Sequence, residues 1–325
     1  MASSAALEVR RDTQPASRFA WVVLGSFILV VLWGAVVRAS GSGGGCGANW
    51  PLCNGDFVPH HPRLATIIEF THRSTSGICT FLLAALAFWT FAVTPRGHRA
   101  RRAVLWSVAL LIVEAFLGAV LVLRGYVENN TSDGRVVAQS IHFTNTMLLM
   151  AALALTAWFL HRPGASTAPR PATAPSTRGA AILAIVATIF VGATGSLAAL
   201  ADTLFPSSSV LAGLTSDFAA GSPVLVRMRW FHPAAAIIGV VCVLWMVRAK
   251  ARAENSRTLF RGISGFVLAS LGLQFVLGIA DVLLLAPTWM QVVHLLGADI
   301  YWIALVILAA QSLWPPQPTA KLASL

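Results

Sequence analysis

The sequence predicts an all-α integral membrane protein whose eight transmembrane helices form two parallel, pseudo-repeated four-helix bundles. Three observations support this prediction. Hydrophobic residues make up 57% of the 325 positions and charged residues 11%. Apolar runs long enough to cross a bilayer as helices recur along the whole chain, and features of the first half return in the second. This composition excludes a water-soluble globular protein.

Eight apolar runs define the expected transmembrane helices. They lie at about 19–38, 66–93, 103–123, 137–160, 179–200, 229–248, 261–285 and 289–314. The first run is too long for the apolar region of a signal peptide and lacks a small-residue cleavage site. We therefore expect it to be retained as the first span.

Basic residues concentrate in the segments that share one side of the membrane if the chain crosses it eight times. Sixteen of the 23 Lys and Arg residues lie there: Arg10, Arg11, Arg18, Arg96, Arg99, Arg101, Arg102, Arg162, Arg170, Arg178, Arg248, Lys250, Arg252, Arg257, Arg261 and Lys321. Because basic loops stay in the cytoplasm, both termini are expected to be cytoplasmic. The net charge of +11 therefore reflects membrane orientation and does not indicate nucleic-acid binding.

The chain divides into two halves that resemble each other. We expect an N-terminal half at 1–160, a flexible cytoplasmic linker rich in Pro, Ala, Ser and Thr at 161–178, and a C-terminal half at 179–325. Matched features recur at offsets of 160 or 152 residues: His72 and His232, Glu114 and Gln274, and Gln139-x-x-His142 and Gln291-x-x-His294. Since each half has an even number of spans, the two copies would run in the same direction.

Four of the eight histidines fall in the first turns of even-numbered helices: His72, His142, His232 and His294. Because these helices all run from outside to inside, the four imidazoles are expected at one depth, in the outer third of the bilayer. His60, His61, His98 and His161 lie in loops, where solvated side chains are the simplest interpretation.

Two imidazoles at one level in each half could ligate one metal centre from opposite sides. Zinc would require further Cys, His or carboxylate ligands, and the second half offers none near its histidines. Axial ligation of haem iron fits better, and small residues such as Gly118 and Gly278 leave room for a flat macrocycle.

The stretch EFTHR places Glu69, His72 and Arg73 together at a membrane boundary, where ionisable groups usually bind or react with something. Arg73, with Arg38 and Arg229 at other outer helix ends, is a candidate partner for haem propionates, because a guanidinium matches a carboxylate bidentately. Snorkelling of these arginines to head groups is the alternative. Glu69 could take a proton or stabilise positive charge during a reaction, or it could orient the His72 imidazole.

Cys46 and Cys53 both lie in the first outer loop. They could form a structural disulfide that shapes a lid, or a redox-active dithiol, because exposed bridges are the labile ones. Cys79 and Cys242 fall inside helices and are expected to pack as small apolar residues.

Several motifs together resemble the haem A synthase family of bacteria and mitochondria. They are GAVVRASGSG, Cys46-x-x-x-Trp50-Pro51-x-Cys53-x-Gly55, EFTHR, and the histidines of spans four, six and eight. The resemblance implies an eight-helix plasma-membrane enzyme that oxidises a ring methyl of haem O to a formyl group, making haem A for terminal oxidases. Haem O would come from haem O synthase. The electron-transfer partner is not indicated.

The resemblance also assigns residues. It implies that His72 and His142 flank the substrate haem, that His232 and His294 ligate haem b, and that Glu69 is the essential carboxylate. In the second half the position matched to Glu69 holds Arg229, which is the asymmetry expected if the first half alone reacts. Some relatives carry a second cysteine pair in the outer loop between spans five and six, and this chain does not.

Two other functions compete with this interpretation. A non-catalytic diheme electron carrier would also need two histidine pairs, but the difference between Glu69 and Arg229 favours chemistry in one half. A transporter would also suit parallel repeats, although transporter sites usually lie near the midplane of the membrane and the candidate site here lies near the outer surface.

Overall fold

The computed structural model describes residues 2–162, 174–254, 259 and 261–314, with side chains described from residue 13. These residues form ten helices joined by loops. They are α1 (Ala2–Ala39), α2 (Leu64–Val93), α3 (Arg99–Leu123), α4 (Asp133–His161), α5 (Pro175–Leu204), α6 (Val210–Phe218), α7 (Val224–Arg227), α8 (Phe231–Ala253), α9 (Gly262–Leu283) and α10 (Thr288–Leu313).

The prediction of eight spans is confirmed by length and composition. Eight helical segments in the described part of the chain are long and apolar enough to cross a membrane, with α7 and α8 forming one of them. Most of these helices begin earlier than the apolar runs do. For example, α4 begins at Asp133, where the Ser132 hydroxyl caps the helix by accepting the Arg135 N–H at 3.3 Å. The polar caps of α3 and α4 extend these two helices past their apolar runs, so hydropathy alone placed their starts too late.

Two short helices were not predicted. The helices α6 and α7 lie in the outer connection between α5 and α8, which the sequence analysis treated as a loop. Ser209 caps α6 by accepting the Ala212 N–H at 3.2 Å. A nine-residue helix is too short to register in a search for membrane spans, although its Ser cap is a recognisable signal.

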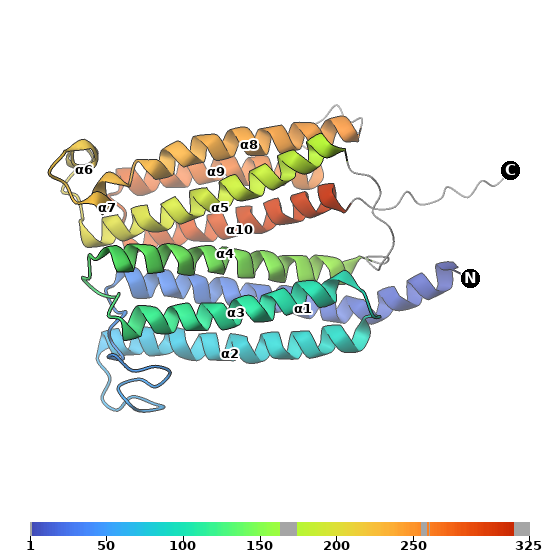
Figure 1. Ribbon diagram of the computed structural model, residues 1–325, viewed down its shortest axis with the longest axis horizontal. Coiled ribbons are helices and arrows are strands. Elements are labelled where there is room, and N and C mark those ends of the chain that lie inside the picture. The colour runs from blue at the N-terminus through green and yellow to red at the C-terminus, as the bar shows by residue number, and fades with distance from the viewer. Residues whose placement is uncertain (1, 163–173, 255–258, 260, 315–325) are drawn as a thin grey trace.

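The helices of the two halves occupy separate parts of the bundle (Figure 1). Helices α1 to α4 lie together in the lower part of the view, and α5, α8, α9 and α10 lie above them. The start of α1 and the end of α10 are at one end of the bundle, while the 40–63 loop and α6 are at the other. This agrees with an even number of crossings. The cytoplasmic side of the termini and the two-repeat arrangement stay predictions.

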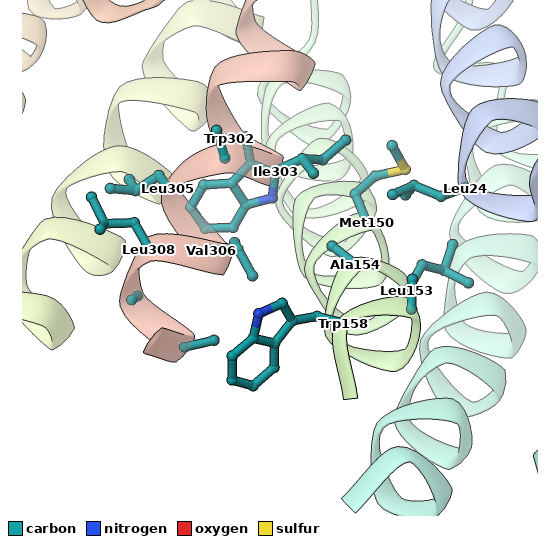
Figure 2. Close-up of a cluster of buried hydrophobic side chains, with 14 of the residues drawn as sticks. Leu24, Met150, Leu153, Ala154, Trp158, Trp302, Ile303, Leu305, Val306 and Leu308 are labelled. Carbon is teal, nitrogen blue, oxygen red and sulfur yellow. The ribbon is translucent and has the colours of Figure 1, made fainter. Parts of the chain in front are cut away.

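The two halves share one hydrophobic core. Helix α4 packs against α5 and α10, and α1 also contacts α10. Figure 2 shows this interface: Trp302 of α10 and Trp158 of α4 lie between the two helices, while Met150 and Leu153 point to the other side of α4, where Leu24 of α1 lies. Most of the predicted linker, 163–173, lies outside the described residues. Among the described residues, helix packing joins the two halves directly.

Trp302 makes the most specific contact of this interface. Its side chain is buried, and its indole N–H donates to the Met147 carbonyl of α4 at 2.8 Å. We expect Trp302→Ala to lower the free energy of unfolding by about 3–5 kcal/mol, because a large buried side chain is lost. Trp302→Phe keeps one aromatic ring and should cost less than Trp302→Ala: about 0.6 kcal/mol for the lost hydrogen bond, plus the packing of the lost five-membered ring. Equilibrium unfolding in detergent measures both, and equal stability of Trp302→Ala and wild type would contradict the role of this contact.

His98 corrects one prediction. We expected a solvated loop histidine, but its side chain is buried, and its Nδ1 caps α3 by accepting the Ala100 N–H at 3.2 Å. Burial lowers the pKa of His98 below its ordinary value, and the positive charges of Arg101 and Arg99 act in the same direction. The neutral imidazole is the form that can accept this bond. We assigned His98 to a solvated loop because the segment around it is basic, and so overlooked that it directly precedes a helix that it could cap.

Candidate functional site

Each of the four predicted histidines packs against a glycine on a neighbouring helix. The distances from a Cβ placed on the glycine to the nearest ring atom are 3.1 Å for Gly34 and His72, 3.7 Å for Gly118 and His142, 2.8 Å for Gly195 and His232, and 3.4 Å for Gly278 and His294. A side chain at the first and third of these glycines would press on the imidazole. The glycine positions recur at offsets of 161 and 160 residues, so each half places its histidines in the same kind of setting.

The second-half pair faces across a short gap. The ring centroids of His232 and His294 are 6.4 Å apart, and the ring planes are 82° to each other. Metal–imidazole bonds of about 2 Å put the centroids of two rings that hold one metal from opposite sides about 6 Å apart. Nδ1 of His232 meets the Val191 carbonyl at 3.1 Å, which leaves Nε2 as the free nitrogen. This pair has the spacing of two axial ligands.

The first-half pair differs in its partners. The buried Nδ1 of His72 makes no hydrogen bond of normal geometry within the described residues, and the Val30 backbone is its polar neighbour. Nδ1 of His142 lies 3.4 Å from the Glu114 carboxylate, which comes from α3. Within the part of the chain that the structure describes, no three His, Cys, Asp or Glu side chains gather as a metal site. Paired imidazoles beside glycines fit a haem, which needs two axial ligands and a flat space.

Glu69 and Arg73 form a buried network with the first outer loop. Glu69 Oε2 accepts the Cys46 N–H at 2.7 Å, and Oε1 accepts Arg73 Nε at 3.1 Å and also Arg73 Nη2. Arg73 Nη1 donates to the carbonyls of Asn49 at 2.6 Å and Leu52 at 2.8 Å. The Glu69 side chain is 4% exposed. The pair therefore anchors the outer loop to the helix that carries His72.

The same loop contains the predicted disulfide. The sulfur atoms of Cys46 and Cys53 are 1.99 Å apart, and the bridge is buried. Cys79 and Cys242 are free and buried, as the sequence predicted. Because the Cys46 N–H binds Glu69, the bridge, the carboxylate and the histidine helix form one connected unit.

Arg229 anchors the outer connection of the second half in a similar way. It donates to Asp217 at 2.8 Å and to Asp202 at 2.9 Å, and Ser216 accepts a further bond at 2.9 Å. Asp217 and Ser216 belong to α6. The residue three positions before the first histidine thus fixes the outer connection in both halves, with a carboxylate in one and a guanidinium in the other.

Arg38 connects the two halves. From α1 it donates to the Ala199 carbonyl at 2.7 Å and the Thr203 hydroxyl at 2.6 Å on α5, and to Gln291 of α10 at 2.7 Å. Arg38, Arg73 and Arg229 each donate most of their N–H groups to protein oxygens. Their role toward haem propionates stays a prediction, and it would require them to exchange these partners.

Sequence reasoning did not identify Glu114 as a site residue. It noted the residue only as the match of Gln274, yet a carboxylate within a span is itself a functional signal. The Asn145 amide donates to Glu114 Oε2 at 2.5 Å, and the Thr146 hydroxyl donates to Oε1. Together with His142, these residues make a polar cluster between α3 and α4.

The fold and the histidine pairs define the class of protein. It is a multi-span helical membrane protein with two matched pairs of imidazoles near one end of its bundle. A sequence model of the COX15-CtaA family, described as cytochrome oxidase assembly protein, matches residues 17–306. The chain belongs to this family.

Curated relatives agree with this assignment. A protein named "Protoheme IX farnesyltransferase" from Thermus thermophilus is 40% identical over 299 residues, which cover 91% of this chain and 48% of the relative. A "Heme A synthase" from Alkalihalophilus pseudofirmus is 40% identical over 98 residues, 30% of this chain and 33% of the relative. One from Bacillus cereus is 34% identical over 128 residues, 39% of each chain. The chain thus spans about half the length of its Thermus relative.

Proposed function

We propose that this protein is a haem A synthase that oxidises a ring methyl of haem O to a formyl group and so makes haem A for terminal oxidases. The observation that supports this most directly is the presence of two histidine–glycine pairs in each half of a COX15-CtaA chain. The names of the Bacillus and Alkalihalophilus relatives support the same activity.

In this proposal the halves have different tasks. His72 and His142 hold the substrate haem in the first half, and His232 and His294 hold haem b in the second. Bound haem b would supply a one-electron redox centre. The 6.4 Å spacing of the second pair and the Val191 carbonyl that orients His232 support this assignment.

Glu69 is the residue on which we propose that the oxidation depends. It lies one helical turn from His72, and the second half has Arg229 in its place. As the structure stands, both carboxylate oxygens accept hydrogen bonds. Glu69 can therefore act on the substrate after releasing the loop, or it can act by holding the loop over the substrate. The variants Glu69→Gln and Arg73→Leu separate these two roles.

The proposal includes a membrane setting and a source of substrate. We place the protein in the plasma membrane with both termini cytoplasmic, because the basic segments share that side. Haem O would come from haem O synthase. The Thermus relative supports this link, because sequence similar to this chain covers 48% of a protein named for farnesyl transfer to protohaem.

Pigment extraction from the purified full-length protein tests the function. We expect a reduced-minus-oxidised haem spectrum and, after extraction, haem b together with haem O and haem A. Haem b alone would favour the diheme electron carrier. A protein without any haem band would contradict both functions and return the transporter to consideration.

A further inference from the structure

A polar cluster between α3 and α4 lies in the first half, and the matched positions of the second half do not reproduce it. We propose that Glu114 is a positioning residue that orients His142 and, through its negative charge, stabilises the ferric state of the haem iron held in the first half. This inference rests on the proposed function, because it needs a haem on His142. Membership of the family assigns no role to Glu114 and says nothing of the reduction potential of the first-half iron.

The carboxylate is fixed beside the imidazole. Glu114 Oε1 lies 3.4 Å from His142 Nδ1, a distance at which an ion pair forms. Asn145 donates to Oε2 at 2.5 Å and to the Leu110 carbonyl of α3 at 2.9 Å, so the same amide ties the two helices together. The Thr146 hydroxyl donates to Oε1. Both oxygens are thus held from the turn of α4 that follows His142.

The charge of Glu114 has no cationic side chain to balance it among the described residues. In that part of the chain, the single ionisable group at ion-pair distance is His142 itself. The two other donors, Asn145 and Thr146, are neutral. The Glu114 side chain is 17% exposed, and the site is in an apolar bundle, where charges interact strongly. A positive iron centre on His142 is the charge that this carboxylate could compensate.

The second half keeps the histidine, as His294, and replaces the other three members of the cluster. Gln274 stands at the position of Glu114, and Gly297 and Ala298 stand where the first half has Asn145 and Thr146. A Cβ on Gly297 would lie 2.2 Å from Gln274 Nε2, so the Gln274 side chain occupies the space above that glycine. Over the ranges that the structure describes, neither Gln274 Nε2 nor His294 Nδ1 has a hydrogen-bond partner.

The consequence concerns the reduction potentials of the two irons. A carboxylate beside a ligating imidazole increases the electron donation of the ring, and its charge favours the more positive oxidation state. A neutral amide does neither. In the first half, Glu114 would therefore lower the reduction potential of the bound iron. In the second half, the neutral Gln274 at the matched position would not.

Redox titration of reciprocal variants tests this inference. In the purified full-length protein, Glu114→Gln should raise the midpoint potential of the first-half haem by about 59 mV, equivalent to a tenfold change in the ratio of ferric to ferrous affinity. The midpoint of haem b should not change. Gln274→Glu should lower the midpoint of haem b and leave the first-half haem as it is. Absorbance changes of the two haem types, assigned by pigment extraction, report each midpoint separately.

Several outcomes would decide the matter. An unchanged first-half midpoint in Glu114→Gln, or equal shifts of both haems, would overturn the inference. If Glu114→Gln loses the first-half haem, Glu114→Asp becomes the deciding variant, because it keeps the charge. Retention of the haem by Glu114→Asp supports the role of the charge. Loss of the haem from both variants shows that Glu114 is needed to build the haem site and not to tune its potential, which overturns the inference. A wild-type protein with haem b alone would instead contradict the proposed function, and this assignment with it.

Discussion

Glu69→Gln is expected to reduce the conversion of haem O to haem A by about 10²–10⁴-fold, the range that a positioned acid or base contributes. Glutamine keeps the shape of the side chain and can still accept the Cys46 N–H, but it loses the charge that pairs with Arg73. The first-half haem should remain bound. The measurement is single-turnover formation of haem A, with the haem content of each variant determined in parallel.

Arg73→Leu is the matched control for Glu69→Gln. It removes the bonds to the Asn49 and Leu52 carbonyls and so loosens that part of the loop, while the Glu69 carboxylate loses its Arg73 partner but keeps its bond from the Cys46 N–H. If Glu69 acts chemically, Arg73→Leu should retain more turnover than Glu69→Gln. If Glu69 acts by holding the loop, the two variants should lose turnover equally. Loss of the first-half haem in Glu69→Gln would show a purely structural role and contradict both expectations.

His232→Ala and His294→Ala are each expected to remove haem b from the purified protein. One axial ligand is lost in each variant, and the remaining imidazole has no second partner across the 6.4 Å gap. The first-half haem should stay, because its histidines come from α2 and α4. Absorbance spectroscopy and pigment extraction measure both haems. His60→Ala is the control, since His60 is exposed in the outer loop, and it should retain both.

The opposite pattern would revise the assignment. If His294→Ala retained haem b while His142→Ala lost it, the two halves would have exchanged tasks. Equal loss of both haems from every histidine variant would indicate general unfolding. The unfolding transition of each variant in detergent distinguishes that case from specific ligand loss.

The membrane spans could be predicted because apolar length is a direct consequence of bilayer thickness. The candidate histidines were chosen by the same argument, since a count along helices of one direction gives equal depth; that common depth stays a prediction. The short helices α6 and α7 could not be found this way. Ser209 and its capping bond decide α6 locally, and local caps carry little weight in a search for long hydrophobic runs.

The polar contacts of the site could not be predicted from composition. The positions of Arg38 and Arg73 at outer helix ends suggested free donors, but each guanidinium finds protein oxygens that come from distant parts of the chain. Glu114 shows the reverse case. The sequence showed that Glu114 matches Gln274. It did not show that Asn145 of the neighbouring helix binds the Glu114 carboxylate. Such partners are fixed by packing and not by spacing along the chain.

The packing of α4 against α10 has a kinetic consequence. His142 lies on α4 and His294 on α10, and the two helices contact each other directly through the core that contains Trp302. Two haems held by these residues would keep a constant edge-to-edge separation. Since electron tunnelling depends steeply on such a separation, the rate of exchange between the irons would depend on how α4 packs against α10.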